Sequence, residues 1–419
     1  MAEQCVLVVG GRPQLVRKAK ELGLHVVLVQ QPDEFQPAQA ELVESALLVD
    51  YTDWSRLRPL AMAAYEVFGF CAAVSTTEPG LEPAGRLNDL LGLNGISHQT
   101  SYLLRDKWAM RQHLAGVGAD TIAADLVRDR ASLLNFGRAH SFPFIVKPVD
   151  AAASLGVTLV AGESDVERVW CGITELRGST KHKFANYFPI DRFLMEEYVP
   201  GPEFSVESFS FDGQHVVVAI TEKQTHTEFV ELRHALPARL DPAVEQRIVG
   251  CVTEFLSTVG VRQGPGHTEV KLSPAGPRVI ESHNRTGGDR ISELVDAAYG
   301  IDLEAYTAAW PAKVWPALTE RPPAKAAAAT RFLISPPGTV TRIQGVADVR
   351  AMDRVLDVDI ALSVGDTVRP LRASWDRVGQ VLVTGADTDA AVLAADQLAE
   401  KITIVTELRD GPRVDAPSP

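Results

Sequence analysis

Two glutamates in the second half of the 419-residue chain carry the strongest chemical signal in the sequence. Glu269 and Glu281 each lie in an apolar run typical of a β-strand, where an inward carboxylate is costly unless it is paired or bound to a metal ion. The segment 274–277, Pro-Ala-Gly-Pro, lies between them, and their spacing is the length of a β-hairpin. We therefore expect the two carboxylates to meet across adjacent strands and to bind Mg²⁺. The alternative is a pair of acids on the polar faces of two strands.

Two lysines and a loop of small residues precede these acids. Lys147 ends an apolar strand-like run against a proline, so its ammonium is expected to face an anion, and Lys107 lies at the head of a predicted helix. The segment 150–157 is built mainly of small residues, which let backbone amides approach phosphate oxygens, and Ser154 adds a hydroxyl donor. Taken alone, each lysine is typical of a surface cation and the loop of an ordinary turn.

Residues 195–207 form a third pattern, in which an apolar strand, a Pro-Gly-Pro turn and a returning strand follow one another. The backbone of such a hinge can pair with the edge of a flat heterocycle. Glu203, just past the turn, can accept hydrogen bonds from two ribose hydroxyls. A plain β-hairpin with exposed acids is the alternative.

The elements that must position these groups follow from hydrophobic patterning. Short apolar runs alternate with helical segments near the N-terminus, which predicts a parallel sheet with helices on both faces. Alternating strand patterns follow from residue 144 onward, and the Pro- and Ala-rich stretch 311–329 is the clearest linker. Beyond it lies a last unit with hairpin-like turns and a closing helix.

Composition and charge exclude several classes of protein. Acidic residues outnumber basic ones by 54 to 41, a formal charge of −13, and this argues against a nucleic-acid partner, which would need a basic patch. No run approaches the ~18 apolar residues of a membrane span, and no basic segment precedes the first apolar run. We therefore expect a cytoplasmic protein with no membrane partner. The four cysteines are far apart, so disulfide and zinc scaffolds lose support.

The order of the patterns along the chain resembles the ATP-grasp superfamily. More narrowly, it is similar to the carboxylate–amine ligases that include the L-amino-acid ligases (dipeptide synthetases). The resemblance implies an α/β protein with the ATP-grasp fold, an N-terminal parallel-sheet (pre-ATP-grasp) domain and a small C-terminal α+β domain. The implied divisions are an N-terminal domain at 1–105, a small ATP-grasp subdomain at 106–195, a large subdomain with the metal site at 196–312, a linker at 313–329, a C-terminal domain at 330–410 and a disordered tail at 411–419.

The resemblance also implies a nucleotide site and a metal site. Two lysines would hold the ATP phosphates, the small-residue loop would close over them, and the hinge would contact adenine and ribose. The residues of this nucleotide site are Lys107, Lys147, Ser154, Gly156, Glu196, Glu197, Tyr198, Val199 and Glu203. The metal ligands would be Glu269, Glu281 and His283, with Mg²⁺ as the cofactor and Mn²⁺ as the alternative. Superfamily members often have Asn at the position of His283, so Asn284 is the alternative third ligand.

Three residues are expected to act in catalysis. By the resemblance, Arg285 would steady an acyl phosphate and the tetrahedral species that follows, and Lys147 would neutralise phosphate charge. His234 would assist deprotonation of the amine, with a hydrogen-bonded structural histidine as an equal alternative. The residues expected to contact substrates are Glu78, Glu222, Glu231, Gly287, Gly288 and Arg290.

The implied enzyme activates a carboxylic acid, expected to be an amino acid, as an acyl phosphate and couples it to an amine. The products would be an amide or dipeptide, ADP and phosphate, the partners would be small-molecule carboxylates and amines, and a homodimer is expected. One alternative is a bicarbonate-using carboxylase of the biotin carboxylase or purine-pathway type, because residues 365–379 resemble the C-terminal part of those enzymes. The other is a catalytically silent nucleotide-binding module.

Overall fold

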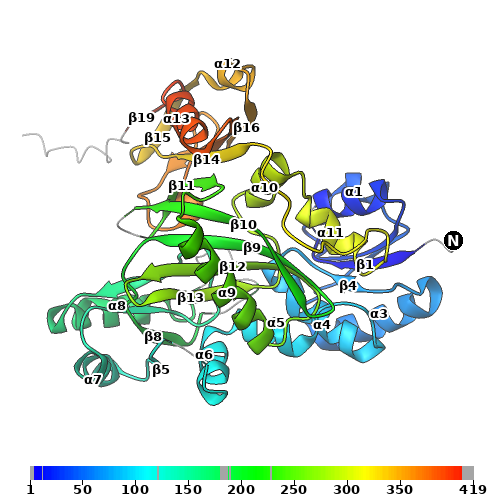
Figure 1. The fold of residues 1–419 in the computed structure, drawn as a ribbon, viewed down its shortest axis with the longest axis horizontal. Coiled ribbons are helices and arrows are strands. Elements are labelled where there is room, and N and C mark those ends of the chain that lie inside the picture. The colour runs from blue at the N-terminus through cyan, green and yellow to red at the C-terminus, as the bar shows by residue number, and fades with distance from the viewer. Residues whose placement is uncertain are drawn as a thin grey trace, which may run out of the picture.

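The computed structural model describes residues 4–11, 13–119, 122–179, 187, 190–226 and 229–407. The chain is arranged as an N-terminal domain, a small subdomain and a large central sheet that continues into a C-terminal unit (Figure 1). The predicted tail at 411–419 lies outside the described residues. None of the described helices is both long and apolar enough to cross a bilayer.

The N-terminal domain is built on a parallel sheet of four strands in the order β3-β2-β1-β4. Alternate residues of β1 enter two cores, with Leu7 and Val9 in one and Val6 and Val8 in the other, so the sheet is covered on both faces as predicted. Its elements are β1 (Cys5–Val9), α1 (Pro13–Glu21), β2 (His25–Gln30), α2 (Pro37–Ala40), β3 (Ser45–Leu48), α3 (Trp54–Phe68), β4 (Ala73–Val74) and α4 (Glu78–Leu91).

Two helices, α5 (His98–Arg105) and α6 (Lys107–Gly116), lead into the small subdomain. That subdomain is an antiparallel sheet in the order β5-β8-β6-β7, with two helices packed on it. Its elements are β5 (Ala124–Leu126), α7 (Arg130–His140), β6 (Phe144–Pro148), β7 (Thr158–Val160), a 3₁₀ turn (Glu163–Asp165), α8 (Val166–Leu176) and β8 (Phe193–Glu197).

The large sheet has eight strands in the order β13-β12-β9-β10-β11-β14-β18-β16 and is antiparallel throughout. On β9, the polar residues Glu203, Ser205 and Glu207 alternate with Phe204 and Val206, which pack in the core beneath α9. The strands and helices up to the linker are β9 (Glu203–Phe211), β10 (Gln214–Thr225), β11 (Glu231–Leu236), α9 (Pro242–Thr258), β12 (Gly264–Ser273), β13 (Gly276–His283), α10 (Ile291–Tyr299) and α11 (Leu303–Ala309).

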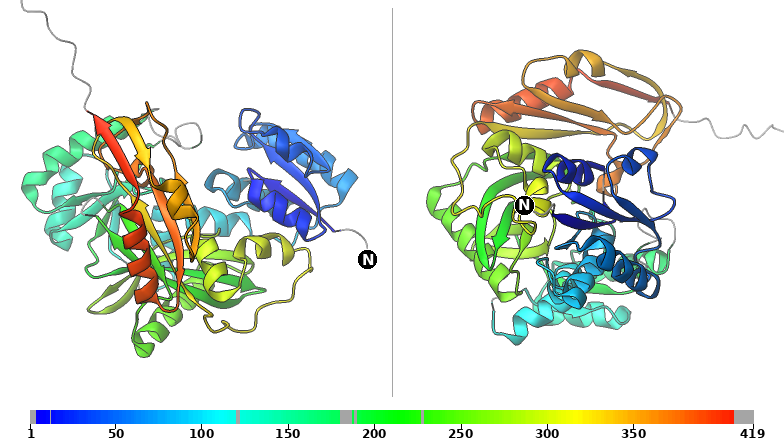
Figure 2. Two further views of the ribbon diagram at one scale, coloured as in Figure 1. Left: turned by 90° about the horizontal axis from the view of Figure 1, so that it is seen from above. Right: turned by 90° about the vertical axis from the view of Figure 1, so that its right-hand side faces the viewer.

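The C-terminal unit is joined to the large sheet by main-chain hydrogen bonds, because β14 pairs with both β11 and β18. In Figure 2 this unit stands apart from the N-terminal domain. Two of the predicted limits fall inside strands, 195/196 within β8 and 329/330 within β14. The remaining elements are β14 (Ala327–Leu333), β15 (Gly338–Gln344), α12 (Val346–Arg350), β16 (Val355–Ile360), β17 (Thr367–Val368), a 3₁₀ turn (Ser374–Asp376), β18 (Gly379–Gly385), α13 (Thr388–Ala399) and β19 (Thr403–Glu407).

Candidate active site

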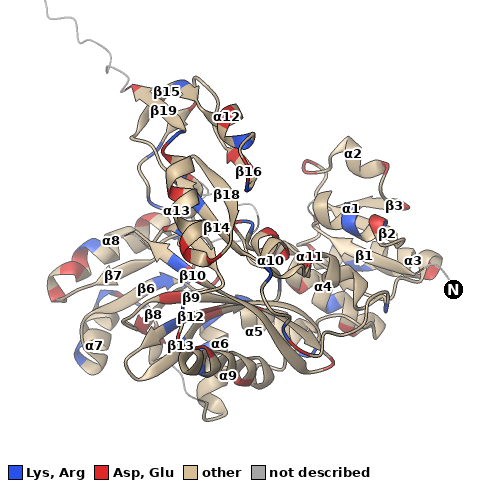
Figure 3. Cartoon of the chain, turned by 45° about the horizontal axis from the view of Figure 1, so that its top comes forward, with Lys and Arg blue, Asp and Glu red and all other residues tan. Residues whose placement is uncertain are grey.

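A cleft lies between the small subdomain and the large sheet and opens to solvent. Acidic and basic residues are intermixed on the strands of the large sheet (Figure 3). Most of the predicted nucleotide and metal residues line the cleft: Lys107, Lys147, Ser154, Glu196, Glu197, Tyr198, Val199, Glu203, Glu269 and Glu281.

The two predicted phosphate lysines are both buried and both paired with glutamates. Lys147 Nζ lies 2.6 Å from Glu196, and Lys107 Nζ lies 3.1 Å from Glu281 and donates to the Ala151 carbonyl at 2.9 Å. Burial opposes ionisation of Lys107, but the charge of Glu281 outweighs it and raises the pKa of the lysine. The structure therefore brings the lysines and one late acid to the same cleft, as the sequence predicted.

Glu196 is held by a second cation that sequence reasoning missed. Arg111, 2% exposed, donates from Nε to Glu196 Oε1 at 2.7 Å and from its two other nitrogens to the carbonyls of Val279 and Ile280. Burial disfavours the carboxylate, but Arg111 and Lys147 outweigh it and lower the pKa of Glu196. Both oxygens of Glu196 thus contact cations, and the hinge residues that follow it line the cleft.

The small-residue loop at 150–157 covers one side of the cleft in a left-handed backbone conformation. Ala153, Ser154 and Gly156 have φ values of +58°, +59° and +72°. The Ser154 hydroxyl donates to the Phe229 carbonyl at 3.1 Å, so it fastens the loop to the far wall. The positive φ at Gly156 favours glycine, and a Cβ there would also crowd the end of the Leu176 side chain at 2.6 Å.

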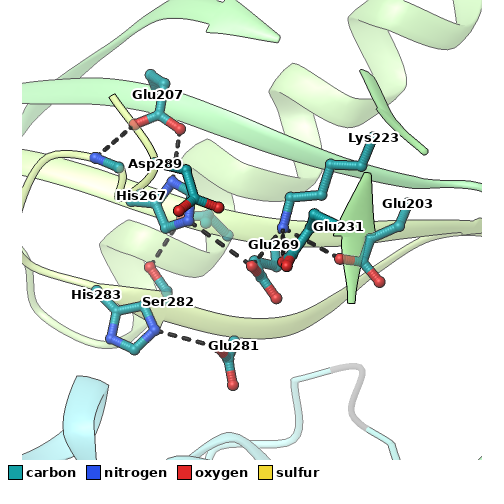
Figure 4. A network of polar contacts seen from close by, with 12 residues as sticks. Glu203, Glu207, Lys223, Glu231, His267, Glu269, Glu281, Ser282, His283 and Asp289 are labelled. Carbon is teal, nitrogen blue, oxygen red and sulfur yellow. Dashed lines mark hydrogen bonds and ion pairs between the residues drawn. The ribbon is translucent and has the colours of Figure 1, made fainter. Parts of the chain in front are cut away.

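The two late acids are directly opposite each other, as the hairpin spacing predicted. Glu269 on β12 pairs in register with Glu281 on β13. Each carboxylate contacts its own lysine. Glu281 lies 3.1 Å from Lys107. Glu269 lies 2.5 Å from Lys223, a contact that Figure 4 shows. Burial opposes ionisation of both acids, but these lysines outweigh it and hold the pKa of each glutamate below its usual range.

The donor set fits a hard divalent cation that keeps other ligands. Within the described part of the chain, no three His, Cys, Asp or Glu side chains converge as a complete metal cage. Mg²⁺ does not need one, because it is commonly bound by one or two carboxylates together with water and substrate phosphates. Glu269 and Glu281 can supply those carboxylates. Asn284, the alternative third ligand, is buried, and its side-chain nitrogen donates to the Ser101 hydroxyl at 2.9 Å.

His283 and Arg285 are organised by Glu78, which reaches the site from the N-terminal domain. Glu78 Oε1 accepts from Arg285 Nε at 2.6 Å and lies 3.0 Å from His283 Nδ1, while His283 Nε2 lies 3.2 Å from Glu281. Burial opposes ionisation of Glu78, but the charges of His283 and Arg285 hold its pKa well below its usual range. One oxygen of Glu78 thus contacts both Arg285 and His283.

The predicted substrate residues divide into two groups. Glu231 lines the cleft. The lining residues do not include Gly287, Gly288, Glu222 or Arg290. Gly287 donates its amide to Glu207 at 3.2 Å, and a Cβ at Gly288 would meet nothing within 4 Å. The carboxylate of Glu222 accepts from Arg239, and Arg290 pairs with Glu293 and with Asp357 at 2.7 Å.

His234 is almost fully buried on β11, with an edge-on ring contact to Phe332. Neither ring nitrogen has a hydrogen-bond partner among the residues that the structure describes. Burial lowers the pKa of His234 to about 3, so the imidazole is neutral near pH 7 and is a weak base. The hydrogen bonds expected of a structural histidine are absent among those residues, and His234 is not among the residues that line the cleft either.

Further polar residues at the site went unpredicted. Arg377 from the C-terminal unit makes two hydrogen bonds to Asp289, at 2.9 and 2.6 Å, beside Glu231. On the sheet behind the metal acids, His267 Nδ1 lies 2.6 Å from Glu207, which is fully buried. An inward acid at alternate positions along β9 was the available signal for Glu207, whereas Arg377 lies too far along the chain for any local pattern to reveal.

The Glu207–His267 pair predicts a dependence of stability on pH. Burial opposes protonation, but Glu207 outweighs it and raises the pKa of His267 to about 9 from 6.5. Because the folded pKa exceeds the unfolded one, this stabilisation is complete below pH 6.5 and is lost as pH rises through 9. By linkage it amounts to about 3 kcal/mol. Urea denaturation at several pH values should show this loss in the parent and not in His267→Gln. If the free energy of unfolding depends on pH equally in both proteins, the raised pKa is not that of His267.

Three family models match successive parts of the chain. The ATP-grasp N-terminal domain matches residues 16–95, the ATP-grasp domain residues 140–293, and the L-amino acid ligase C-terminal domain 2 residues 331–407. The chain therefore carries an ATP-grasp domain and a C-terminal domain of the L-amino acid ligase type, and the resemblance in the sequence is confirmed. ATP-grasp domains use ATP with a divalent metal ion.

Curated relatives are similar over part of their length. The chain is 28% identical over 254 residues to alanine–anticapsin ligase of Bacillus subtilis (strain 168), a match that covers 57% of this chain and 53% of that protein. It is 22% identical to an L-arginine-specific L-amino acid ligase of Bacillus subtilis, with 64% of each covered. The chain thus spans about half the length of the first of these relatives.

Among solved structures, an L-amino acid ligase from Bacillus licheniformis superposes with a TM-score of 0.79 at 21% identity. The superposition covers 97% of this chain and 99% of that one. At this identity the likeness establishes the fold, and it confirms the predicted order of N-terminal sheet, ATP-grasp subdomains and C-terminal unit.

Proposed function

We propose that the protein is an ATP-dependent carboxylate–amine ligase that joins two amino acids, or an amino acid and another amine, through an acyl phosphate. The observation that carries the proposal is the convergence on one cleft of Lys107, Lys147 and the facing acids Glu269 and Glu281. Amino acid ligases among the relatives and the matched C-terminal domain support it over a bicarbonate-using carboxylase.

In this proposal ATP lies along the cleft with its phosphates toward the lysines. Lys147 and Lys107 would leave Glu196 and Glu281 in part to contact phosphate oxygens, while the backbone of 197–199 meets adenine and Glu203 meets ribose. The loop at 150–157 offers backbone amides and excludes water, which protects an acyl phosphate from hydrolysis. Its attachment through Ser154 to the opposite wall supports a covering role.

Glu269 and Glu281 would hold the divalent ion, which we propose to be Mg²⁺. Bound there, Mg²⁺ would neutralise phosphate oxygens and so reduce the repulsion of an incoming carboxylate. His283 lies 3.2 Å from Glu281 and would be the third protein ligand.

The chain's own residues would support two transfers. In the first, a carboxylate oxygen of the substrate attacks the γ-phosphorus and ADP leaves, with Lys147 and Arg285 balancing the charge. In the second, the amine attacks the acyl carbon and inorganic phosphate leaves. The departing phosphate can accept the proton of the amine, and Glu78 would orient Arg285 throughout.

A panel of amino-acid pairs tests the proposal directly. Each pair is incubated with ATP and Mg²⁺, phosphate and ADP are measured, and the product is identified by mass spectrometry. We expect phosphate release to require two substrates and the product mass to equal their sum less one water. ADP release that depends on bicarbonate would instead support the carboxylase, and ATP binding without ADP across the panel would support the silent module.

A further inference from the structure

A buried lysine on the floor of the cleft lies outside the nucleotide, metal and catalytic assignments above. Lys223, on β10, has a side chain only 2% exposed. Its Nζ lies 2.5 Å from Glu269, 3.2 Å from Glu203 and 3.7 Å from Glu231, and Figure 4 shows the three carboxylates gathered around it. One ammonium therefore contacts three acids, while His267 lies farther off, 3.8 Å from Glu269, and Arg377 lies 4.0 Å from Glu231.

The three acids come from three different strands, and each faces a different part of the proposed site. Glu203 on β9 is on the ribose side, Glu269 on β12 is a metal acid, and Glu231 on β11 is on the acceptor side. Lys223 stands on β10, which runs between β9 and β11, and it is in register with His234 on β11. Lys223 thus contacts one acid from each of the ribose, metal and acceptor parts of the proposed site.

We infer that Lys223 is the resident counter-ion of the metal site, holding Glu269 when no nucleotide is bound and yielding that carboxylate to the divalent ion when one binds. The ammonium then rests between Glu203 and Glu231. Lys223 is a positioning residue, because it acts through Glu269. The inference rests on the proposed function for the metal-binding role of Glu269.

Two other carboxylates lie close enough to receive the Lys223 ammonium when it leaves Glu269. Mg²⁺ binds carboxylate oxygens at about 2.0–2.1 Å, so an ion that binds Glu269 Oε1 displaces the ammonium that contacts this oxygen. The lysine stem is flexible and its ammonium has three donors, and the oxygens of Glu203 and Glu231 lie within 4 Å of it. No acid on the floor is left without a cation in either state.

The consequence is an inverted effect of removing the lysine. In Lys223→Met, Mg²⁺ no longer displaces an ammonium, so nucleotide-free protein titrated with Mg²⁺ alone by calorimetry should bind it about tenfold more tightly. Lys223→Arg, which keeps a cation there, should bind Mg²⁺ within about twofold of the parent. A merely structural role for Lys223 predicts weaker binding in Lys223→Met, and weaker or unchanged binding would overturn the inference.

Lys271→Met is the matched control. Lys271 lies on the same strand as Glu269 and lines the same cleft, but its ammonium lies over the Tyr198 ring, 5.2 Å from the centroid. Equal tightening in Lys271→Met and Lys223→Met would reveal a general effect of net charge and would overturn the inference.

If Lys223→Met does not fold, a second variant tests the inference by changing an acid that receives the ammonium. Glu231→Gln weakens the alternative position of the ammonium, so Mg²⁺ binding should weaken, and unchanged or tighter binding would count against the inference. These titrations involve no turnover. If Mg²⁺ binds more tightly to Lys223→Met but the parent protein forms no amide in the substrate panel, the ligase proposal is rejected. The inference that Lys223 is the counter-ion of the metal site would then still stand.

Discussion

Glu281→Gln should reduce ADP formation by about 1,000-fold, which corresponds to about 4 kcal/mol of activation free energy. Gln keeps the shape of the side chain and a carbonyl that Lys107 can contact, but it removes the negative charge opposite Glu269. One carboxylate cannot replace two in holding a divalent ion against phosphates. The measurement is ADP release with the best substrate pair from the panel at saturating ATP and Mg²⁺.

The control for this experiment is Glu163→Gln. Glu163 pairs with Arg138 on the surface of the small subdomain, and both side chains are more than half exposed. That variant should turn over at the parental rate. Turnover of Glu281→Gln within a few-fold of the parent, with an unchanged circular dichroism spectrum, would refute the metal role of Glu281.

Arg111→Met should lower the free energy of unfolding by about 3–5 kcal/mol, the usual cost of removing one partner from a buried ion pair. Arg111 connects three elements, because it extends from α6 to Glu196 on β8 and to two carbonyls of β13. Methionine fills similar space without donors, so the two carbonyls lose their partners and Glu196 keeps only Lys147. Urea denaturation followed by circular dichroism measures the change.

Arg138→Met provides the comparison for that variant, because it also removes an arginine from a glutamate. Its side chain is 60% exposed, so the expected loss is below about 1 kcal/mol. A similarly small loss in Arg111→Met would show that the buried guanidinium is not what holds the small subdomain to the large sheet.

The parts of the site that could be predicted from sequence are those with a strong local pattern. Glu269 and Glu281 interrupt apolar strand runs at hairpin spacing, and Lys147 ends such a run against a proline, so their elements and their exposure to the cleft follow from residues nearby. The parallel sheet of the N-terminal domain was predictable for the same reason. Resemblance to a family then placed these local patterns in one site.

Glu222 was predicted to contact substrate, whereas its neighbour Lys223 is the residue that faces the cleft. This error shows what local patterns leave open. Successive residues on a strand point to opposite faces, so one position decides whether a side chain enters the cleft. Residues 221–224 are all polar, and their alternation therefore does not distinguish the two faces. In the structure Lys223 faces the cleft and Glu222 pairs with Arg239. Arg111 and Arg377 were missed because their partners lie more than 80 residues away.

Strand β14 limits how chains of this kind can be recombined. It is inserted between β11 and β18, so the C-terminal unit and the floor of the cleft share one hydrogen-bonded ladder. A chimera in which this unit is exchanged at the 313–329 segment would also exchange the strand next to Glu231 and His234. A graft that omitted β14 would leave β11 with an open edge, which invites pairing with another chain.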